Sequence, residues 1–412
     1  MNRAILAGLA VSEDITHSMD ELSGLAQAAE AEVQGLLVQN LERPNKATFI
    51  GKGKAAELAE MCKNMEADMV IFNDELSGVQ LRNLEEILGV RVIDRTILIL
   101  DIFASRAISG EGKLQVELAQ LGYRLPRLVG FGKALSRLGG GIGTRGPGEK
   151  KLETDRRHIS RRMDEIKSEI ERLRSSRNIR RARREKSEIP VAALVGYTNS
   201  GKSAIMNKLL EIADKSEKAV FEEDMLFATL DTAHRSIKLE NNNEFILIDT
   251  VGFVSKLPHS LVSAFKATLE EVNFADLLIH VVDASCENCD FQIEVTEGVL
   301  KEIGAGGKEK LLVYNKIDIA WDEIIHTKGE ESIYVSAKTG YNVDALLEKI
   351  KEKLFSGRVN ATFLIPYDRG DIASYICDKA EVFSMDYVES GVIICAEVKS
   401  ADYNRFKRYE RI

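Results

Sequence analysis

The stretch that most constrains the fold reads VAALVGYTNSGKS and runs from Val191 to Ser203. Its apolar, partly β-branched start suits a buried strand, and Gly196 and Gly201 let backbone N–H groups curve round an anion without a Cβ in the way. A strand, a glycine-rich loop and a helix N-terminus in this order form a phosphate-binding P-loop. We therefore expect Lys202 to reach the β and γ phosphates and Ser203 to ligate Mg²⁺. The predicted phosphate-binding residues are Gly196, Tyr197, Thr198, Asn199, Ser200, Gly201, Lys202 and Ser203.

A second apolar run, Phe245–Ile248, predicts a buried strand whose end should lie near the γ-phosphate. Asp249 follows it directly and can hold Mg²⁺ through water, while the Gly252 amide can bond the γ-phosphate. The segment before this strand should supply a Thr hydroxyl to Mg²⁺, for which Thr229 is the candidate and Thr232 the nearest rival. This part of the predicted site comprises Phe227, Ala228, Thr229, Leu230, Asp231, Asp249, Thr250, Val251 and Gly252, and the predicted catalytic residues are Lys202, Thr229 and Gly252.

A third strand candidate, Lys310–Tyr314, is followed by residues that select the base. The Asp318 carboxylate can accept hydrogen bonds from N1–H and the 2-amino group of guanine, and adenine lacks both donors. Sites that hydrogen-bond a substrate group reject the analogue without it by roughly 10⁴ or more. The backbone after the strand candidate Ile333–Val335 can read guanine O6. The predicted base-binding residues are Asn315, Lys316, Ile317, Asp318, Ser336, Ala337 and Lys338, and the four motifs together predict a guanine-specific GTPase domain.

Length and composition describe a chain of several domains. The 412 residues predict roughly two to four domains at about 150 residues each. No apolar run approaches the roughly 20 residues of a membrane-spanning helix, so we expect a cytoplasmic protein without a membrane span. Five cysteines without framework spacing fit a reducing compartment. Cys286 and Cys289 form a CxxC, but no second pair accompanies them, and we interpret this stretch as a surface loop rather than a zinc site.

Charge is distributed unevenly along the chain. The net charge is −9, yet residues 118–186 contain 20 Lys and Arg against 8 Asp and Glu. Apolar residues recur at spacings of three and four on both sides of Gly139–Gly148, first at Leu114, Leu118 and Leu121 and then at Ile159, Met163, Ile166, Ile170 and Leu173. This pattern predicts an antiparallel helical hairpin with a glycine-rich loop, whose first helix ends or kinks at Pro126. The basic charge favours RNA as partner over a merely solvated helix face.

The remaining stretches predict an α/β multidomain protein. Alternating strand and helix candidates before residue 95 imply a small parallel α/β domain. After Leu354, Phe355–Asn360 resembles a linker, and a helix candidate at Ile372–Lys379 precedes a hairpin of Ala380–Tyr387 and Gly391–Val398. We therefore expect an N-terminal α/β domain over 1–110, a basic helical hairpin over 111–188, a P-loop GTPase domain over 189–356 and a small α+β C-terminal domain over 357–412.

Several longer stretches resemble the HflX family of ribosome-associated GTPases, of the Obg–HflX-like group, over almost the whole chain. The glycine-rich GGGIGTRGPGEKKLETDRRHI block is the most specific of them. The resemblance departs at Ala204 and Ile205, where the family usually has Thr and Leu, and at Thr232–Arg235, where it usually has Pro-Thr-Thr-Arg. The stretches are ATFIGKGK (Ala47–Lys54), NDELSGVQLRNLEE (Asn73–Glu86), DRTILILDIFASRA (Asp94–Ala107), EGKLQVELAQL (Glu111–Leu121), the glycine-rich block (Gly139–Ile159), GYTNSGKS, LFATLD (Leu226–Asp231), DTVGF and NKID.

The resemblance implies a function for the parts already described. It implies that the N-terminal region and the hairpin bind the large ribosomal subunit and its RNA, with the hairpin loop near the peptidyl transferase centre. It also implies that the GTP-bound protein splits stalled or idle ribosomes into subunits. Asn199 stands where potassium-activated GTPases have an asparagine, so K⁺ joins Mg²⁺ as a candidate cofactor. Phe253 stands where Ras-like enzymes place the glutamine that orients water, so we expect slow hydrolysis that a partner stimulates.

The sequence thus predicts a GTP hydrolase, expected to be monomeric, that binds GTP and GDP and dissociates ribosomes. One alternative is a GTP-gated ribosome-binding or large-subunit maturation factor in which hydrolysis only drives release. Another is an RNA-remodelling ATPase that uses the N-terminal domain, although that domain has no P-loop.

Overall fold

The structure, a computed structural model, describes residues 2–11, 15–127, 147–187, 189–213, 226–227, 232–239, 244–256, 269–286, 288–320 and 332–411. It divides into two compact units. The first comprises Met1–Arg183, Glu223–Asp231 and Val251–Glu270, and the second comprises Arg184–Glu222, Thr232–Thr250 and Glu271–Ile412. Two short segments from the predicted GTPase domain therefore belong to the same unit as the N-terminal sheet. The α/β multidomain class predicted from the sequence is confirmed, while the four domain boundaries stay predictions.

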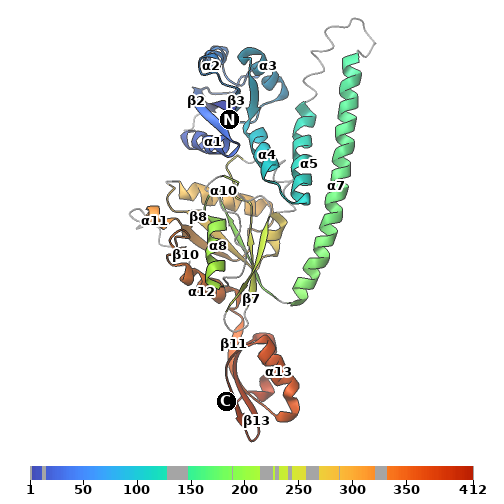
Figure 1. Cartoon of the computed structure of the whole chain (residues 1–412), viewed down its shortest axis with the longest axis vertical. Helices are drawn as coiled ribbons and strands as arrows, with labels where there is room; N and C mark the ends of the chain where they lie inside the picture. The colour runs from blue at the N-terminus through green and yellow to red at the C-terminus, as the bar shows by residue number, and fades with distance from the viewer. Residues whose placement is uncertain are drawn as a thin grey trace. The chain divides into compact units, whose positions relative to one another are not determined.

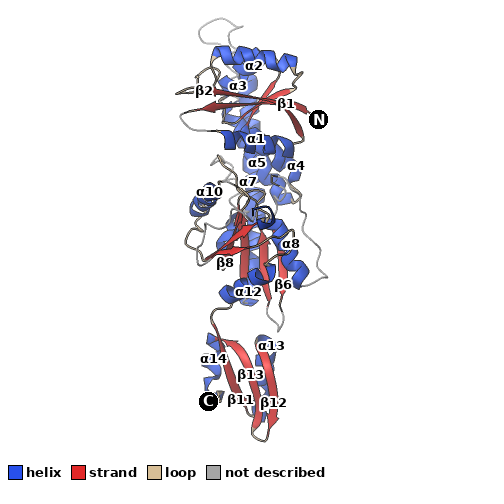
Figure 2. Ribbon diagram, turned by 90° about the vertical axis from the view of Figure 1, so that its left-hand side faces the viewer, coloured by secondary structure: helices blue, strands red, loops and turns tan. Residues whose placement is uncertain are grey.

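The N-terminal sheet has four parallel strands in the order β2-β1-β3-β4. Alternate residues of β1 serve two cores, because successive strand residues face opposite sides. One core lies against α1 and α4 and the other against α2 and α3, so helices cover both faces (Figures 1 and 2). The elements are β1 (Asn2–Ala10), α1 (Thr16–Ala28), β2 (Ala31–Asn40), α2 (Lys52–Asn64), β3 (Met69–Phe72), α3 (Gly78–Leu88), β4 (Arg91–Asp94) and α4 (Arg95–Arg106).

Two long helices, α5 (Gly110–Arg127) and α7 (Pro147–Ser187), run side by side in opposite directions (Figure 1). Arg162 of α7 donates from Nε and Nη2 to the two carboxylate oxygens of Glu117, at 2.8 and 2.9 Å. Ile166 is fully buried in the predicted apolar seam, whereas Leu173 is 39% exposed. Pro126 lies inside the last turn of α5, one residue before its last residue, Arg127. Most of the predicted glycine-rich loop falls outside the described residues, and its last two residues already belong to α7.

The predicted GTPase domain contains a six-stranded sheet in the order β10-β9-β8-β5-β7-β6. Only β6, at the edge, pairs antiparallel, and the other strands pair in parallel. The carboxyl ends of parallel strands share one edge of a sheet, which is where ligands bind in such folds. Its elements include β5 (Val191–Gly196), α8 (Lys202–Ala213), β6 (Ala233–Lys238), β7 (Glu244–Asp249), β8 (Leu277–Asp283), α10 (Cys289–Glu302), β9 (Lys310–Asn315), α11 (Ile317–Ala320), β10 (Ser332–Tyr334) and α12 (Val343–Leu354).

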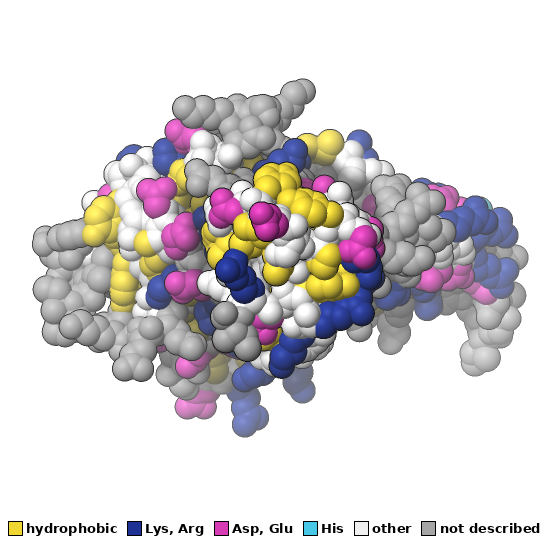
Figure 3. Space-filling view, turned by 90° about the horizontal axis from the view of Figure 1, so that it is seen from below, with side chains coloured by type: hydrophobic (Ala, Val, Ile, Leu, Met, Phe, Trp, Pro, Cys, Tyr) yellow, Lys and Arg dark blue, Asp and Glu magenta, His cyan; other side chains and the backbone are white. Residues whose placement is uncertain are grey.

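The C-terminal residues form an antiparallel sheet in the order β11-β13-β12, with helices on one face (Figure 2). The expected linker over Phe355–Asn360 is wrong in its second half, because a strand begins at Arg358. Exposed aromatic side chains include Tyr367, Phe383 and Tyr387, and Figure 3, which views this end of the molecule, shows hydrophobic side chains close to Lys and Arg. The elements are β11 (Arg358–Ile365), α13 (Gly370–Lys379), β12 (Glu381–Val388), β13 (Gly391–Lys399) and α14 (Ser400–Phe406).

Candidate nucleotide site

The P-loop joins the central strand β5 to helix α8 and has a backbone that requires two of its glycines. Gly196 and Gly201 have φ values of +150° and +87°, a region that residues with a Cβ rarely adopt. A Cβ at Gly196 would lie 2.2 Å from the Val281 carbonyl oxygen, and one at Gly201 would lie 2.1 Å from Asn315 Nδ2. Asn199 also has a positive φ, +59°. The glycine spacing of the motif therefore follows from close approach of neighbouring strands as well as from phosphate binding.

Lys202 lies inside the loop rather than in solvent. Its ammonium group donates to the carbonyl oxygens of Tyr197, at 2.7 Å, and Gly196, at 3.2 Å. Burial lowers the pKa of Lys202 to about 8, and the nearby Asp249 carboxylate opposes that shift. A buried cation held by neutral carbonyls is poorly compensated, and phosphate oxygens would supply the missing negative charge.

Ser203, in the first turn of α8, and Asp249, the last residue of β7, lie next to each other. The Ser203 hydroxyl donates to Asp249 Oδ2 at 2.6 Å, and Thr250 Oγ1 anchors the next residue by donating to the Leu194 carbonyl at 2.6 Å. A hydroxyl and a carboxylate are the hard oxygen ligands that Mg²⁺ prefers. Within the described ranges, no three His, Cys, Asp or Glu side chains cluster in a way that could hold a metal. The residues therefore fit Mg²⁺ only when phosphate oxygens and water complete its coordination.

The base-recognition loop is tied to the P-loop through Asn315. Its Nδ2 donates to the Ser200 carbonyl and its Oδ1 accepts from the Ala337 amide, both at 3.0 Å. These two bonds fix the separation between the phosphate end and the base end of the site. The same residue contacts both P-loop and base-binding segments, which a sequence motif alone does not reveal.

Asp318 is exposed, yet its carboxylate is oriented. Ser336 Oγ donates to Asp318 Oδ1 at 2.6 Å, which leaves the remaining acceptor positions for the two guanine donors. Lys316 has φ +65° and its ammonium pairs with Asp283 Oδ2 at 2.8 Å. Asp283 has no motif of its own in the sequence, and the ion pair identifies it as a support of this loop.

The other predicted site residues are placed differently. Ala228, Thr229, Leu230 and Asp231 lie outside the described residues. Phe227 is 2% exposed and packs edge-to-face on Phe103 of α4, with ring centroids 4.6 Å apart. Val251 and Gly252 belong to the first unit, as does Phe253, which is 2% exposed. The buried Phe253 ring has no group that can orient a water molecule, in agreement with the expectation from its residue type.

Taken with the strand order of the sheet, this geometry places the second unit in the class of P-loop GTPases. Family comparisons extend the match over most of the chain. Residues 16–104 match the family described as GTP-binding GTPase N-terminal, 106–184 match the GTP-binding GTPase middle region, and 191–316 match the 50S ribosome-binding GTPase family. The chain belongs to the HflX GTPase family, and its reaction is the hydrolysis of GTP.

Curated relatives support that assignment. The chain is 50% identical over 407 residues to GTPase HflX of Caldanaerobacter subterraneus, covering 99% of this chain and 93% of that one. It is 42% identical over 378 residues to GTPase HflX of Escherichia coli, covering 90% and 87%. A GTP-binding protein from Sulfolobus solfataricus in complex with GDP matches with a TM-score of 0.45 at 26% identity, covering 86% and 99%. Among the described residues, no helix is long and apolar enough to cross a membrane.

Proposed function

We propose that this chain binds the large ribosomal subunit and its RNA, and that its GTP-bound form separates stalled or idle ribosomes into subunits. The match of residues 191–316 to a family of 50S ribosome-binding GTPases supports this partner. The observation that carries the proposal is a strongly basic helical hairpin in the same chain as a GTP site. We expect the protein to act as a monomer and in the cytoplasm, where ribosomes are.

The hairpin presents its charge to solvent. Arg156, Arg157 and Arg161 on α7 are exposed. Arg157 pairs with Glu153 at 2.7 Å, but its side chain is 78% exposed, and such surface pairs contribute little energy. An exposed guanidinium group can donate two parallel hydrogen bonds to the oxygens of one phosphate. When arginines neutralise phosphates, the nucleic acid releases the counterions that it had bound. Binding through this helix should therefore weaken steeply as the salt concentration rises.

For hydrolysis, we propose direct attack of water on the γ-phosphate. Lys202 neutralises the charge that develops on the β and γ phosphates, and the Gly252 amide bonds the γ-phosphate. Ser203, Thr229 and, through water, Asp249 would hold Mg²⁺, which supplies further charge neutralisation when bound. Because the buried Phe253 cannot orient water, we propose slow hydrolysis that the ribosome stimulates. Fast hydrolysis by the purified protein alone would refute this step.

A K⁺ ion is proposed as a second cofactor next to Asn199. This half-buried residue is held at φ +59° in the P-loop, and its side-chain oxygen is of the type that binds monovalent cations. A cation there would replace part of the positive charge that an arginine finger supplies in related enzymes. Hydrolysis rates in KCl and in NaCl at equal ionic strength test this role, and equal rates would exclude it.

The test of the ribosomal partner is GTP hydrolysis with and without purified large subunits, at two salt concentrations. We expect strong stimulation that falls at the higher salt concentration. A triple variant, Arg156→Gln, Arg157→Gln and Arg161→Gln, should reduce the slope of log affinity against log salt by about three. The matched control, Arg405→Gln, Lys407→Gln and Arg408→Gln in the C-terminal domain, removes the same charge and should leave the slope unchanged. If both variants reduce the slope equally, binding to the large subunit depends on the net charge of the protein and not on helix α7.

Subunit profiles distinguish splitting from the alternative, a ribosome-binding or maturation factor in which hydrolysis only drives release. The burial of Phe253 favours neither, since both use slow hydrolysis. With a non-hydrolysable GTP analogue, a splitting factor releases free subunits from intact ribosomes. A maturation factor binds the large subunit and leaves intact ribosomes unchanged.

A further inference from the structure

The segment that follows Asp249 is held inside the N-terminal part of the first unit. Val251 and Val254 are 6% and 1% exposed and share one hydrophobic core with helices α1 and α4. Ser255 is also buried, at 6% exposure. A short stretch of the predicted GTPase domain is therefore packed as an integral part of another domain, and its polar backbone groups need partners there.

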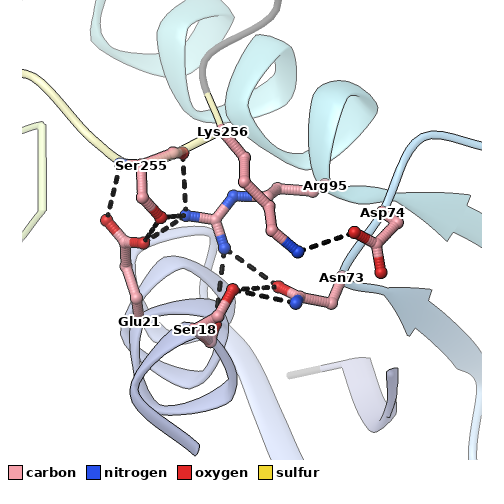
Figure 4. Close-up of polar contacts among 7 residues, drawn as sticks. All are labelled: Ser18, Glu21, Asn73, Asp74, Arg95, Ser255 and Lys256. Atoms are coloured by element: carbon pink, nitrogen blue, oxygen red, sulfur yellow. Dashed lines mark hydrogen bonds and ion pairs between the residues drawn. The ribbon is translucent and has the colours of Figure 1, made fainter. Parts of the chain in front are cut away.

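A buried ion pair supplies those partners (Figure 4). Arg95 Nη2 donates to the Ser255 carbonyl oxygen at 3.2 Å and to its hydroxyl oxygen at 3.1 Å. Glu21 accepts from the Ser255 amide at 3.3 Å, and also from the Ser255 hydroxyl and from Arg95 Nη2. The two charged side chains are 4% and 2% exposed. The ion pair between Glu21 and Arg95 thus binds the amide, the carbonyl and the hydroxyl group of Ser255.

Further contacts fix the pair itself. Arg95 Nη1 donates to Asn73 Oδ1 at 3.0 Å and to the Ser18 carbonyl at 3.4 Å. The next residue of the segment, Lys256, pairs with Asp74 Oδ1 at 2.6 Å (Figure 4). Helix α1, the end of β3 and the start of α4 all contribute to the network, so its geometry depends on the folded N-terminal domain.

The residue before Arg95 connects the same helix end to the basic hairpin. Asp94, fully buried, accepts from the Tyr123 hydroxyl of α5 and from the Leu76 amide, the latter at 2.9 Å. Arg127 of α5 lies over the Tyr123 ring, 3.3 Å from its centroid. The first turn of α4 therefore contacts hairpin and segment through two consecutive residues.

We propose that Glu21 and Arg95 are positioning residues for the nucleotide-sensing segment 251–256, and that the start of α4 couples this segment to the hairpin. The proposal rests on the function proposed above, in which the Gly252 amide bonds the γ-phosphate and the hairpin binds the ribosome. Ser255 is three residues from Gly252, so the chain between them spans at most about 10 Å. Fixing Ser255 restricts the positions open to the Gly252 amide and reduces the entropy lost when it meets the γ-phosphate.

Anchoring of Ser255 should affect the binding of GTP and not that of GDP, because GDP has no γ-phosphate for the Gly252 amide to bond. Loss of the anchor should weaken binding of a non-hydrolysable GTP analogue by about tenfold, the cost of ordering roughly one further residue. Binding of GDP should stay within about twofold of the wild-type value. Because the start of α4 also contacts the hairpin through Asp94 and Tyr123, the same loss should reduce the stimulation of hydrolysis by large ribosomal subunits.

The main variant is Glu21→Leu with Arg95→Met in the full chain. Replacing both members of a buried ion pair by apolar residues is often neutral or stabilising, whereas removing one leaves an unpaired charge. A milder second variant, Ser255→Ala, removes the hydroxyl and leaves both charges in place. The matched control, Arg3→Met with Glu66→Leu, makes the same chemical changes at an ion pair with 2.7 Å separation in the same domain. A third variant, Tyr123→Phe, removes the hydrogen bond from α5 to Asp94 and leaves the ion pair between Arg127 and Asp94, at 3.8 Å, in place.

The measurements are dissociation constants for GDP and for the GTP analogue by fluorescence titration, and hydrolysis with large subunits. We expect the ratio of the two constants to change in the first two variants and not in the control. Tyr123→Phe should keep that ratio and reduce the stimulation. An unchanged ratio, or tighter binding of the analogue, would overturn the positioning role. If wild-type protein shows no stimulation by large subunits, the proposed ribosomal function fails, while the ratio of constants still tests the anchor.

Discussion

Binding of guanine nucleotides should take up protons near pH 8, because the lysine that meets the phosphates is buried. Burial lowers the pKa of Lys202 to about 8 from 10.5, despite the opposing effect of Asp249. Two phosphate groups close to the ammonium favour its charged form and raise that pKa again. In the protein without nucleotide, the lowered pKa reduces the free energy of unfolding below about pH 8, and this loss is recovered as the pH rises towards 10.5.

The magnitude follows from the pKa. At pH 8 about half of the Lys202 side chains are neutral, so each binding event should take up about half a proton, compared with about a tenth at pH 7. Affinity should fall by about fourfold between pH 7 and pH 8.5, since only the charged form binds well. Two other shifted groups stay out of this range: the buried His280 has a pKa of about 4 and the half-buried Cys289 one of about 11, both because of burial.

The assay is titration calorimetry of GDP binding at pH 8 in two buffers that differ in ionisation enthalpy. The difference between the observed enthalpies gives the number of protons taken up. The control is Lys202→Arg, whose guanidinium keeps its charge at every pH in the range; its affinity should be lower but independent of pH. Absence of proton uptake by the wild-type protein, or equal uptake by Lys202→Arg, would refute the reasoning.

Three further predictions concern single side chains. Asp318→Asn exchanges an acceptor for a donor, so affinity for GTP should fall by about 100-fold or more while xanthosine triphosphate binds better, as competition titrations would show. Gly201→Ala places a Cβ 2.1 Å from Asn315 Nδ2 at φ +87° and should weaken nucleotide binding by about tenfold or more; Gly298→Ala, with nothing within 4 Å, is the control and should not. Tyr123→Phe leaves buried Asp94 without one donor, which should lower the free energy of unfolding in urea by about 1–3 kcal/mol; an unchanged midpoint would contradict this role.

The strands and helices around the P-loop were predictable because each carries its own periodic pattern. Val191–Val195 and Phe245–Ile248 are short apolar runs, and both lie in central strands of the sheet. Boundaries were less predictable. The apolar spacing of the sequence predicts a helix over Glu21–Glu32, but α1 begins at Thr16 and ends at Ala28, and the chain turns at Glu30, which has φ +58° without being a glycine.

The strand β11 was missed for a different reason. Its first residues, Arg358 and Asn360, are polar and follow a helix, and so resemble a linker. The alternation that marks a strand starts only at Ala361, and it continues with Phe363 and Ile365, which are buried against the helices. Pairing with β13 over eight residues extends the strand beyond the part whose sequence pattern shows it.

By itself the sequence predicted the nucleotide site, because phosphate and guanine recognition use residues at short, regular spacing. Residues 196–203 and Asp318 lie at or just after the ends of recognisable strands, and Asp249 ends one. Only the tertiary structure decided that Ser255 is held by Glu21 and Arg95, which lie 234 and 160 positions away. A buried charge is tolerated only where a partner meets it, and its partner is chosen by the packing of distant elements. No local pattern encodes that choice.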